Sequence, residues 1–395
     1  MTTRVLCVLL ACLVFSFVVS CGGSAGAASS QATSPAISSV APACSPTTIV
    51  AGATSQCTAN VTGTGTYSSA VIWSVTGGGT ISPAGLYTAP GGAANVTVTA
   101  TSTEDPSKSG TVPITVQAMP PPPPQIPQSH HIVLVMEENQ SYSTVVGATT
   151  VWPNLNALIA HGALPTNYYA DSHPSIGNYF MLTTGQLLTT DDTSTQVFDV
   201  DNIARRMLTS GVTFRVYAEG ITQGYIGGST GLYLIRHNPF AMLSDVAGNQ
   251  QVANQVLLPF SQFATDLANN ALPDFSYVVP DVDDDAHDGT PQQADTWLQT
   301  NIVAPLSASV AFRSGGDGLL IVDFDEAADT DTINGGGHVA PVFWGPNVKP
   351  AYTQASGTLY QHESMLRTVM EALGLPNPPA AAATAPSMTE FFIQP

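Results

Sequence analysis

The sequence predicts an α/β fold for residues 130–395, preceded by a small all-β domain at residues 36–117. In the long segment, apolar runs typical of buried strands alternate with segments of helical composition, which indicates a mainly parallel sheet with helices on both faces. In the short segment, β-branched and small residues alternate between Gly, Pro and Ser turns, and helical periodicity is absent. Five consecutive prolines at 120–124 separate the two, so residues 118–129 are expected to form a stiff linker.

The first 35 residues predict a secreted protein. Residues 5–20 form an apolar run behind Arg4 that is long enough for a signal peptide and short for a membrane span. The residues before Cys21 resemble the bacterial lipobox, which implies a signal peptide at 1–20, lipid on Cys21 and a flexible tether at 21–35. The alternative is ordinary secretory cleavage near residues 25–27. We therefore expect export across the inner membrane, followed by lipid anchoring in the bacterial cell envelope or release outside the cell.

The composition excludes several classes of partner. The formal net charge is −19, with nine Lys plus Arg, so nonspecific binding to nucleic acid or to an anionic membrane face is not expected. Membrane contact would come from the N-terminal lipid alone, and any bound phosphate would have to be held by a metal and by local dipoles. Of the five cysteines, Cys44 and Cys57 remain in the mature folded part and could form one disulfide in an oxidising compartment.

The all-β segment is expected to contain strands at residues 58–62, 70–75 and 96–100. Together with the cysteine pair, Trp73, the glycines at 77–79 and the stretch 85–90, it resembles bacterial immunoglobulin-like domains. The resemblance implies a β-sandwich and is carried by features that many sandwiches share. We expect this domain to act as a spacer rather than as the binder of a specific ligand.

In the α/β segment, five apolar runs predict strands at 132–136, 212–217, 275–279, 319–322 and 339–344. Segments of helical composition lie at 152–161, 202–210, 291–308 and 362–373. Residues 227–231 match the nucleophile-elbow string of hydrolases, but no clear strand precedes them and no clear helix follows. We therefore expect a flexible loop there.

Acidic and amide side chains follow two of the predicted strands. Glu138 and Asn139 come after the first strand, and Asp325 and Glu326 come after the run at 319–322. The carboxyl ends of parallel strands meet at one edge of a sheet, where open α/β proteins build their sites. Carboxylate and amide oxygens suit a hard divalent cation. A solvated turn is the alternative for either pair alone.

Ser175 is a candidate nucleophile at a junction between strand-like and helix-like sequence. No histidine and acid pair can be placed beside it from the sequence, so its activation is most simply explained by a metal that binds it as an alkoxide. Asn178 and the N-terminal amides of the following helix would then contact the non-bridging phosphate oxygens. The alternative role for Ser175 is to cap the helix N-terminus.

The segment 281–288 is the densest polar cluster, with five aspartates and His287 within eight residues. Mutual repulsion means that an ordered loop here needs a cation or ample solvent. A calcium loop of the EF-hand type is excluded because Ala286 replaces the turn glycine and Gln292 replaces the bidentate glutamate. With His338 further on, the loop fits a site of mixed nitrogen and oxygen ligands such as zinc or manganese.

These motifs in order resemble the bacterial phosphoesterase family that includes acid phosphatases and phospholipases C, within the alkaline phosphatase superfamily. They are residues 135–139 with 141, 142 and 147; 173–175 with 178 and 179; 280 and 285–288 with 297 and 298; 325 and 326; and 337–339 with 345 and 346. The resemblance covers nearly all of residues 130–395, and it implies an alkaline-phosphatase-like fold.

The resemblance also implies roles for individual residues. A metal would be surrounded by Glu138, Asn139, Ser175, Asp325 and Glu326, with Ser175 as nucleophile and Asn178 on the phosphate. His287 and His338, with Asp285, would complete the opposite side, as ligands of a second metal or as groups that steady the phosphate and the leaving oxygen. Two departures qualify the match. Gly177 stands where family members often carry proline, and Glu137 next to Glu138 could shift the ligand by one position.

The sequence therefore predicts a phosphomonoesterase that depends on a divalent metal and forms a phosphoserine intermediate at Ser175. The metal could be zinc, manganese, magnesium or calcium, and the partner is a phosphoester substrate. The alternatives are a phospholipase C type phosphodiesterase and a noncatalytic surface-binding lipoprotein whose acidic loop holds structural calcium.

Overall fold

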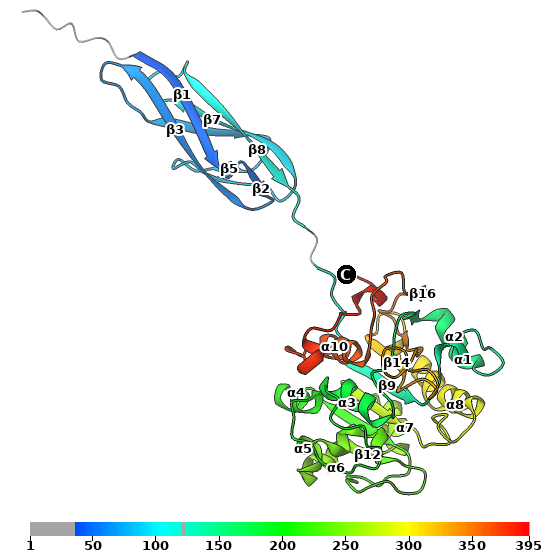
Figure 1. Cartoon of the computed structure of the whole chain (residues 1–395). Helices are drawn as coiled ribbons and strands as arrows, with labels where there is room; N and C mark the ends of the chain where they lie inside the picture. The colour runs from blue at the N-terminus through cyan, green and yellow to red at the C-terminus, as the bar shows by residue number, and fades with distance from the viewer. Residues whose placement is uncertain (1–35, 121–122, 395) are drawn as a thin grey trace, which may run out of the picture. The chain divides into compact units, whose positions relative to one another are not determined.

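The computed structural model describes residues 36–120 and 123–394, which form two compact units divided between Pro122 and Pro123 (Figure 1). The signal peptide, the lipobox and the tether predicted from the sequence lie outside the described residues. Within these two ranges, no helix has the length and apolar character needed to cross a membrane.

The first unit consists of two four-stranded sheets. One has the order β1-β3-β6-β5, made of β1 (Ala36–Ser45), β3 (Thr54–Thr64), β6 (Leu86–Thr88) and β5 (Thr80–Ile81). The other has the order β2-β8-β7-β4, made of β2 (Thr48–Val50), β8 (Ser109–Gln117), β7 (Ala94–Ser102) and β4 (Val71–Thr76). The strands predicted at 58–62 and 96–100 lie inside the longer β3 and β7, and the strand predicted at 70–75 is offset from β4 by one residue.

A buried cluster joins the two sheets of this unit. Tyr87 of one sheet packs with Val98 and Ile114 of the other, and all three are at most 1% exposed. The predicted disulfide between Cys44 and Cys57 is present and joins register partners on β1 and β3, within one sheet. Antibody domains instead bridge their two sheets with a disulfide. The two-sheet architecture agrees with a sandwich, and the immunoglobulin-like assignment stays a prediction.

The second unit contains an eight-stranded sheet of order β12-β11-β13-β9-β14-β15-β10-β16. Five neighbouring pairs are parallel and two, β14 with β15 and β10 with β15, are antiparallel. The sheet is thus mainly parallel, as predicted. Its strands are β9 (His131–Glu137), β10 (Ala163–Leu164), β11 (Phe214–Ala218), β12 (Leu257–Pro259), β13 (Phe275–Val279), β14 (Gly318–Phe324), β15 (Val342–Trp344) and β16 (Tyr352–Thr353).

The strand expected at 339–344 is shorter than predicted and begins at Val342. The chain between β14 and β15 contains no helix, which is the element that usually carries the crossover between parallel neighbours. β15 therefore pairs antiparallel with β14, and residues 325–341 become a long loop at the edge of the sheet. This loop carries several of the predicted site residues.

The α-helices of this unit include all four predicted helical segments. They are α1 (Tyr142–Val145), α2 (Pro153–His161), α3 (Ile176–Thr184), α4 (Ile203–Ser210), α5 (Ser244–Ala247), α6 (Gln250–Val256), α7 (Ser261–Ala268), α8 (Pro291–Leu298), α9 (Ala304–Ala308) and α10 (His362–Ala372). The π-helical turn η3 (Gln299–Val303) joins α8 to α9, so the predicted helix at 291–308 is continuous. The 3-10 turns are η1 (Ile235–His237), η2 (Pro239–Met242), η4 (Val310–Phe312), η5 (Ala380–Ala383) and η6 (Thr389–Phe391).

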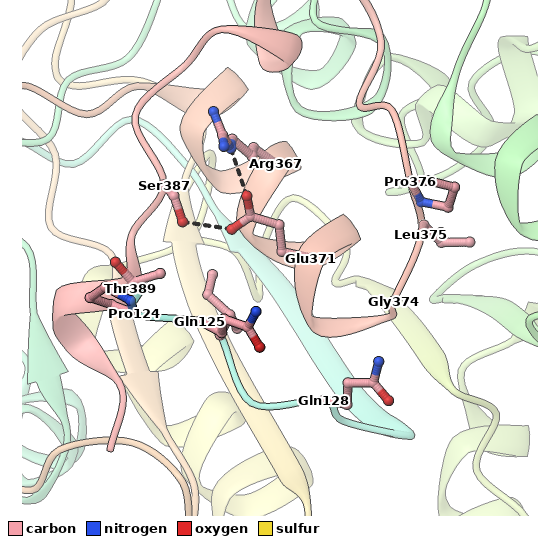
Figure 2. A pocket seen from close by; sticks show the side chains of 11 residues that line it. Pro124, Gln125, Gln128, Arg367, Glu371, Gly374, Leu375, Pro376, Ser387 and Thr389 are labelled. Carbon is pink, nitrogen blue, oxygen red and sulfur yellow. Dashed lines mark hydrogen bonds and ion pairs between the residues drawn. The ribbon is translucent and has the colours of Figure 1, made fainter. Parts of the chain in front are cut away.

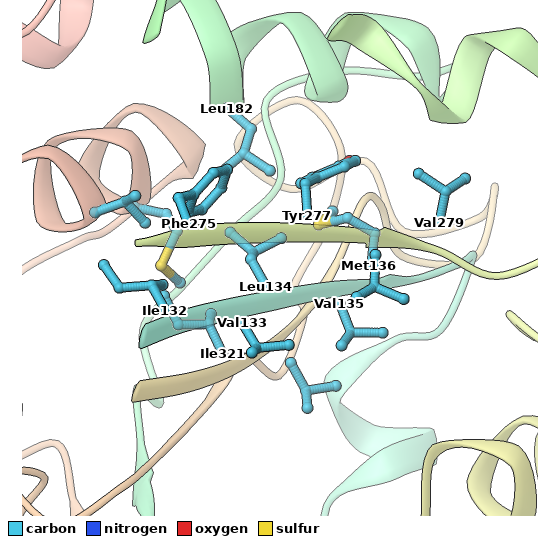
Figure 3. Packing of buried hydrophobic residues seen from close by; sticks show 14 of the residues in the cluster. Ile132, Val133, Leu134, Val135, Met136, Leu182, Phe275, Tyr277, Val279 and Ile321 are labelled. Carbon is cyan, nitrogen blue, oxygen red and sulfur yellow. The ribbon is translucent and has the colours of Figure 1, made fainter. Parts of the chain in front are cut away.

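The central strand β9 is buried on both faces, which explains its continuous apolar sequence. On one face, Leu134 lies with Phe275 and Tyr277 of β13 beneath Leu182 of α3 (Figure 3). Val133 and Val135 project from the opposite face, as the alternation of a strand requires. Helix α3, which follows Ser175, is therefore held against the sheet by its own apolar residues.

The parallel strands β13, β9 and β14 are neighbours and end at the same edge of the sheet. Glu138 follows β9, the acidic loop at 281–288 follows β13, and Asp325 follows β14. Three distant segments of sequence therefore converge there, as predicted.

A cavity of about 450 Å³ lies away from this edge, between residues 124–128 and the end of α10 (Figure 2). Gln128 lines it before β9 begins, so the length of that strand, about 23 Å, separates it from Glu138. Its charged groups are paired with one another: Arg367 lies 2.7 Å from Glu371, and Ser387 donates to the same carboxylate at 2.6 Å. Ile126 beside it is 6% exposed and belongs to the core of this unit.

Candidate active site

Ser175 lies at the start of α3, where its backbone forms the helix N-cap position. Its side chain does not cap the helix. The hydroxyl instead lies 3.2 Å from Glu138 Oε2, and the serine is only 3% exposed. The structure thus brings the predicted nucleophile to the end of β9 and selects Glu138 over Glu137 as its neighbour. Glu137, the last residue of β9, is buried, and its side-chain carboxylate has no hydrogen-bond partner among the described residues.

Asn139 and Asp325 link the ends of β9 and β14. The Asn139 backbone N–H donates to Asp325 Oδ1 at 3.1 Å, and its side-chain amide donates to Glu138 Oε2 at 3.1 Å. Asn139 adopts a left-handed conformation with φ of 58°, which asparagine tolerates better than most residues. The Glu326 backbone N–H also donates to Asp325 Oδ1, at 2.6 Å. The carboxylates predicted at the two strand ends therefore lie together in one buried cluster.

His237, which the sequence analysis did not select, lies between two acidic side chains of the site. Its Nε2 is 3.0 Å from Glu138 Oε1, and its Nδ1 is 3.2 Å from Asp285 Oδ2. Burial by itself lowers the pKa of His237, but the charge of Glu138 and hydrogen bonds to Asp285 and Glu138 outweigh it and raise the pKa to about 9. His237 is therefore an imidazolium at neutral pH, stacked on the ring of Tyr179.

Glu138 is the acceptor at the centre of this cluster. Burial would raise its pKa, but the charge of His237 and the hydrogen bonds it receives lower the pKa to about 2. Tyr179 also donates its hydroxyl to Glu138. Glu138 therefore stays ionised although it is fully buried. The predicted ligand Asp285 is turned toward His237, and burial raises its pKa to about 6.

Asn178 is engaged with the chain just before Ser175. Its Oδ1 accepts the backbone N–H groups of Asp171 and Ser172, and its Nδ2 donates to the Ser172 carbonyl at 2.8 Å. The same amide is 3.4 Å from Glu326 Oε2. A Cβ on Gly177 would lie 2.3 Å from Ser172 Oγ, so glycine allows this close approach. Contact of Asn178 with phosphate stays a prediction, and its hydrogen bonds fix the loop at 171–172.

His287 lies near Glu138 and His237, whereas His338 does not. His287 Nδ1 is 2.8 Å from Asp288, and its Nε2 is 2.9 Å from Nη2 of Arg236. His338 stacks between Tyr142 and Tyr169, and its Nε2 is 3.0 Å from the Thr166 carbonyl. The two histidines therefore occupy separate places in this structure. No direct contact between them supports the prediction that they complete the same side of the site.

A second buried network lies behind the cluster and was also missed by the sequence analysis. His362 Nε2 is 2.8 Å from the backbone carbonyl of Asp325, and the Tyr168 hydroxyl donates to Asp323 at 3.0 Å. Burial lowers the pKa of His362, but hydrogen bonding to Asp323 and its charge raise it to about 9. This network holds the backbone of Asp325 in place from the first turn of α10.

The buried acidic side chains around Ser175 fit a divalent cation. Asp325 Oδ2 has no hydrogen-bond partner among the described residues. Burial and the charges of Glu138 and Glu326 raise the pKa of Asp325 well above its usual range. Burial, followed by the charges of nearby carboxylates, raises the pKa of Glu326 to about 9. A cation bound among these oxygens would relieve their repulsion.

Potential metal-binding side chains gather in three places within the described part of the chain. The groups whose ligand atoms lie within 4.8 Å of one another are Glu138, His237 and His287; His173, Glu326 and Asp329; and Glu219, Asp281 and Asp284. The first two flank Ser175, and each contains a residue predicted as a ligand. The third joins Asp281 and Asp284 of the acidic loop to Glu219, which follows β11.

His237 and Arg236 were missed by sequence analysis for the same reason. His237 and its neighbour Arg236 lie in η1, which follows a long loop and no predicted strand. The strand-end rule therefore gave no reason to select them. A histidine flanked by arginine and asparagine in an otherwise apolar stretch was the available signal. Residues 227–231, by contrast, belong to a loop as predicted.

Sequence comparison relates this chain to known phosphatases. Residues 148–376 match the model of the phosphoesterase family. The chain is 31% identical over 270 residues to a phosphatidylinositol-3-phosphatase from Mycobacterium tuberculosis, covering 68% of this chain and 84% of the relative. It is 28% identical over 260 residues to a probable acid phosphatase from Kluyveromyces lactis, covering 62% of this chain and 58% of the relative.

Among solved structures, a protein in the alkaline phosphatase superfamily from Vibrio parahaemolyticus aligns with a TM-score of 0.43 and 15% identity. That alignment covers 67% of this chain and 72% of the other.

Proposed function

This chain belongs to the phosphoesterase family, and we propose that this phosphoester hydrolase is a metal-dependent phosphomonoesterase that forms a phosphoserine at Ser175. The observation that carries the proposal is a buried serine hydroxyl surrounded by carboxylates, 3.2 Å from Glu138, at the end of the central strand. The names of the relatives support a monoester: both that we compared are phosphatases.

The groups around Ser175 are poor bases, which favours activation by a cation. Glu138 accepts from the hydroxyl, but its pKa of about 2 makes it too weak to remove the serine proton. His237 has a pKa of about 9 and already carries its proton at neutral pH. A divalent cation held by Glu138, Asn139, Asp325 and Glu326 would lower the pKa of the serine hydroxyl and offset the charge of the phosphate.

The reaction would proceed in two displacements at phosphorus. Ser175 Oγ loses its proton and forms a bond to phosphorus while the bond to the ester oxygen breaks, and the alcohol leaves with one proton, so the step is balanced in protons. Water then attacks the phosphoserine, restoring the hydroxyl and releasing inorganic phosphate. The chain supplies orientation: Asn178 fixes the loop before the nucleophile, and α3 is held to the sheet by its apolar face.

A substrate panel tests the proposal. Purified protein would be assayed on soluble phosphomonoesters, on phosphodiesters, on phosphatidylinositol phosphates and on phosphatidylcholine, each with and without a chelator. We expect metal-dependent release of inorganic phosphate from monoesters. Faster cleavage of phosphatidylcholine to phosphocholine would support the phospholipase C alternative instead, and turnover that survives complete metal removal would contradict the role of the cation.

For localisation, we propose that the mature protein is held at the bacterial envelope by lipid on Cys21. The lipobox-like residues 18–20 and the small residues after Cys21 support this. Mass spectrometry of the mature N-terminus should find acylated Cys21, and Cys21→Ser should move the protein from the membrane fraction to the soluble fraction. An unmodified terminus beyond residue 21 would show a freely secreted enzyme.

A further inference from the structure

Arg236 is a basic side chain set close to the nucleophile. Its Nη2 lies 2.9 Å from His287 Nε2, and His287 belongs with Glu138 to a group whose ligand atoms are within 4.8 Å of one another. Glu138 in turn contacts Ser175. Arg205, Arg206, Arg215 and Arg367 are instead paired with carboxylates outside this cluster. A positive charge at the site is notable in a chain with a net charge of −19.

The hydrogen-bonding capacity of Arg236 is largely unused. A guanidinium has five N–H donors, and the contact with His287 uses one of them. Its Nε is buried without a hydrogen-bond partner among the described residues, and the side chain is only 17% exposed. Leaving such donors unpaired in a buried place is costly. A ligand with several acceptor oxygens would satisfy them.

A carboxylate of the protein lies beside these donors. Asp192 Oδ1 accepts the backbone N–H of Ile176 at 3.1 Å, and Asp192 Oδ2 is 3.6 Å from Arg236 Nε, too far for a hydrogen bond. Ile176 directly follows Ser175 and opens α3, a nine-residue helix. The amide expected to contact phosphate is therefore occupied by an anion that Arg236 also faces.

We propose that Arg236 binds the non-bridging oxygens of the substrate's phosphate. In the free enzyme the Asp192 carboxylate occupies the phosphate position beside Arg236 and the Ile176 N–H, and the phosphate displaces it. The planar guanidinium matches two phosphate oxygens at once. It interacts more strongly with the dianion of a monoester than with the single charge of a diester. Arg236 thus makes the site selective for phosphomonoesters, an inference that rests on the proposed function.

Variants at the two positions test this in the metal-loaded full chain. Arg236→Gln should raise the inhibition constant of inorganic phosphate by about 10- to 100-fold. It should lower kcat/KM for p-nitrophenyl phosphate by a similar factor, and for bis-p-nitrophenyl phosphate by a clearly smaller one. Arg236→Lys should recover part of the loss. Asp192→Asn should lower the phosphate inhibition constant by about 2- to 5-fold. Arg206→Gln on α4 is the matched control and should change neither constant.

Two outcomes would overturn the inference. Equal losses on both esters with an unchanged phosphate inhibition constant would show that Arg236 only positions His287. A higher phosphate inhibition constant in Asp192→Asn would show that Asp192 orients Arg236 rather than competing with phosphate. Thermal stabilisation by inorganic phosphate gives a readout without turnover: it should be present in the parent and lost in Arg236→Gln. If the parent binds phosphate in this way but cleaves no ester, the proposed function fails while the assignment of Arg236 stands.

Discussion

Replacing His237 by glutamine tests the charge balance of the buried cluster. The imidazolium is 2% exposed and lies 3.0 Å from Glu138 and 3.2 Å from Asp285. Without it, two buried carboxylates lose their cation, and a neutral glutamine does not replace the positive charge. Removing one partner of a buried ion pair costs about 3–5 kcal/mol, so we expect the free energy of unfolding of the metal-free second unit to fall by that amount at pH 6.

The stabilising contribution of His237 to the free energy of unfolding should decrease as the pH rises. The folded pKa of His237 is raised to about 9, against about 6.5 in an unfolded chain. Its contribution is therefore fully present below about pH 6.5 and is lost as the pH rises through about 9. The difference between the parent and His237→Gln should shrink over that window.

Urea unfolding of chelated protein would measure the effect. The fluorescence of Trp152, Trp297 and Trp344 reports the second unit, and a Trp73→Phe background removes the signal of the first. His161→Gln, on an exposed residue at the end of α2, is the matched control and should change stability by less than about 0.5 kcal/mol. A loss below about 1 kcal/mol for His237→Gln at pH 6, or a loss that does not vary with pH, would refute the reasoning.

Three further predictions concern the metal and the two units. Chelation should abolish turnover, and readdition of one divalent metal should restore it. Because the pKa of Glu326 is raised to about 9, metal binding at pH 7 should release protons, which calorimetry would detect as binding heats that depend on the buffer. The metal affinity should then rise up to about tenfold per pH unit for each proton released. Heats that do not depend on the buffer would contradict that protonation state. A truncated protein that begins at Pro123 should keep the parent's turnover, whereas one that begins at Gln128 should be less stable because it lacks the buried Ile126. If the protein that begins at Pro123 is folded but loses most of its turnover, the first unit helps to build the site. Replacing both Cys44 and Cys57 by alanine should destabilise the first unit by about 3 kcal/mol, because the disulfide closes a loop with a sequence separation of 13 residues. Phosphatase activity should not change. Equal stability of the first unit with and without the disulfide would count against this prediction.

The part of the site that follows from strand ends was predictable, because its logic is local in sequence. Glu138 and Asp325 directly follow buried strands, and parallel pairing alone brings them together. The choice between Glu137 and Glu138 was not predictable, since it depends on which residue still belongs to β9. The structure decides it, because Glu137 ends the strand and Glu138 turns toward Ser175.

The roles of side chains on loops required three-dimensional contacts. His237 and Arg236 reach the site through a long connection whose path no periodicity describes. Asn178 was predicted to contact phosphate, yet its side-chain amide is hydrogen-bonded to the loop at 171–172. From the sequence, phosphate binding was expected to come from a metal and from dipoles, and Arg236 was overlooked because the overall charge is so negative.

Trapping the covalent intermediate tests the central claim most directly. Metal-loaded protein would be mixed with a ³²P-labelled phosphomonoester, quenched in acid within the first turnover and digested for peptide mapping. The account predicts acid-stable label on the peptide that contains Ser175, and Ser175→Ala should show no label and a turnover reduced by more than about a thousandfold. Label on a different residue, or a folded Ser175→Ala protein within about tenfold of the parent's turnover, would contradict it.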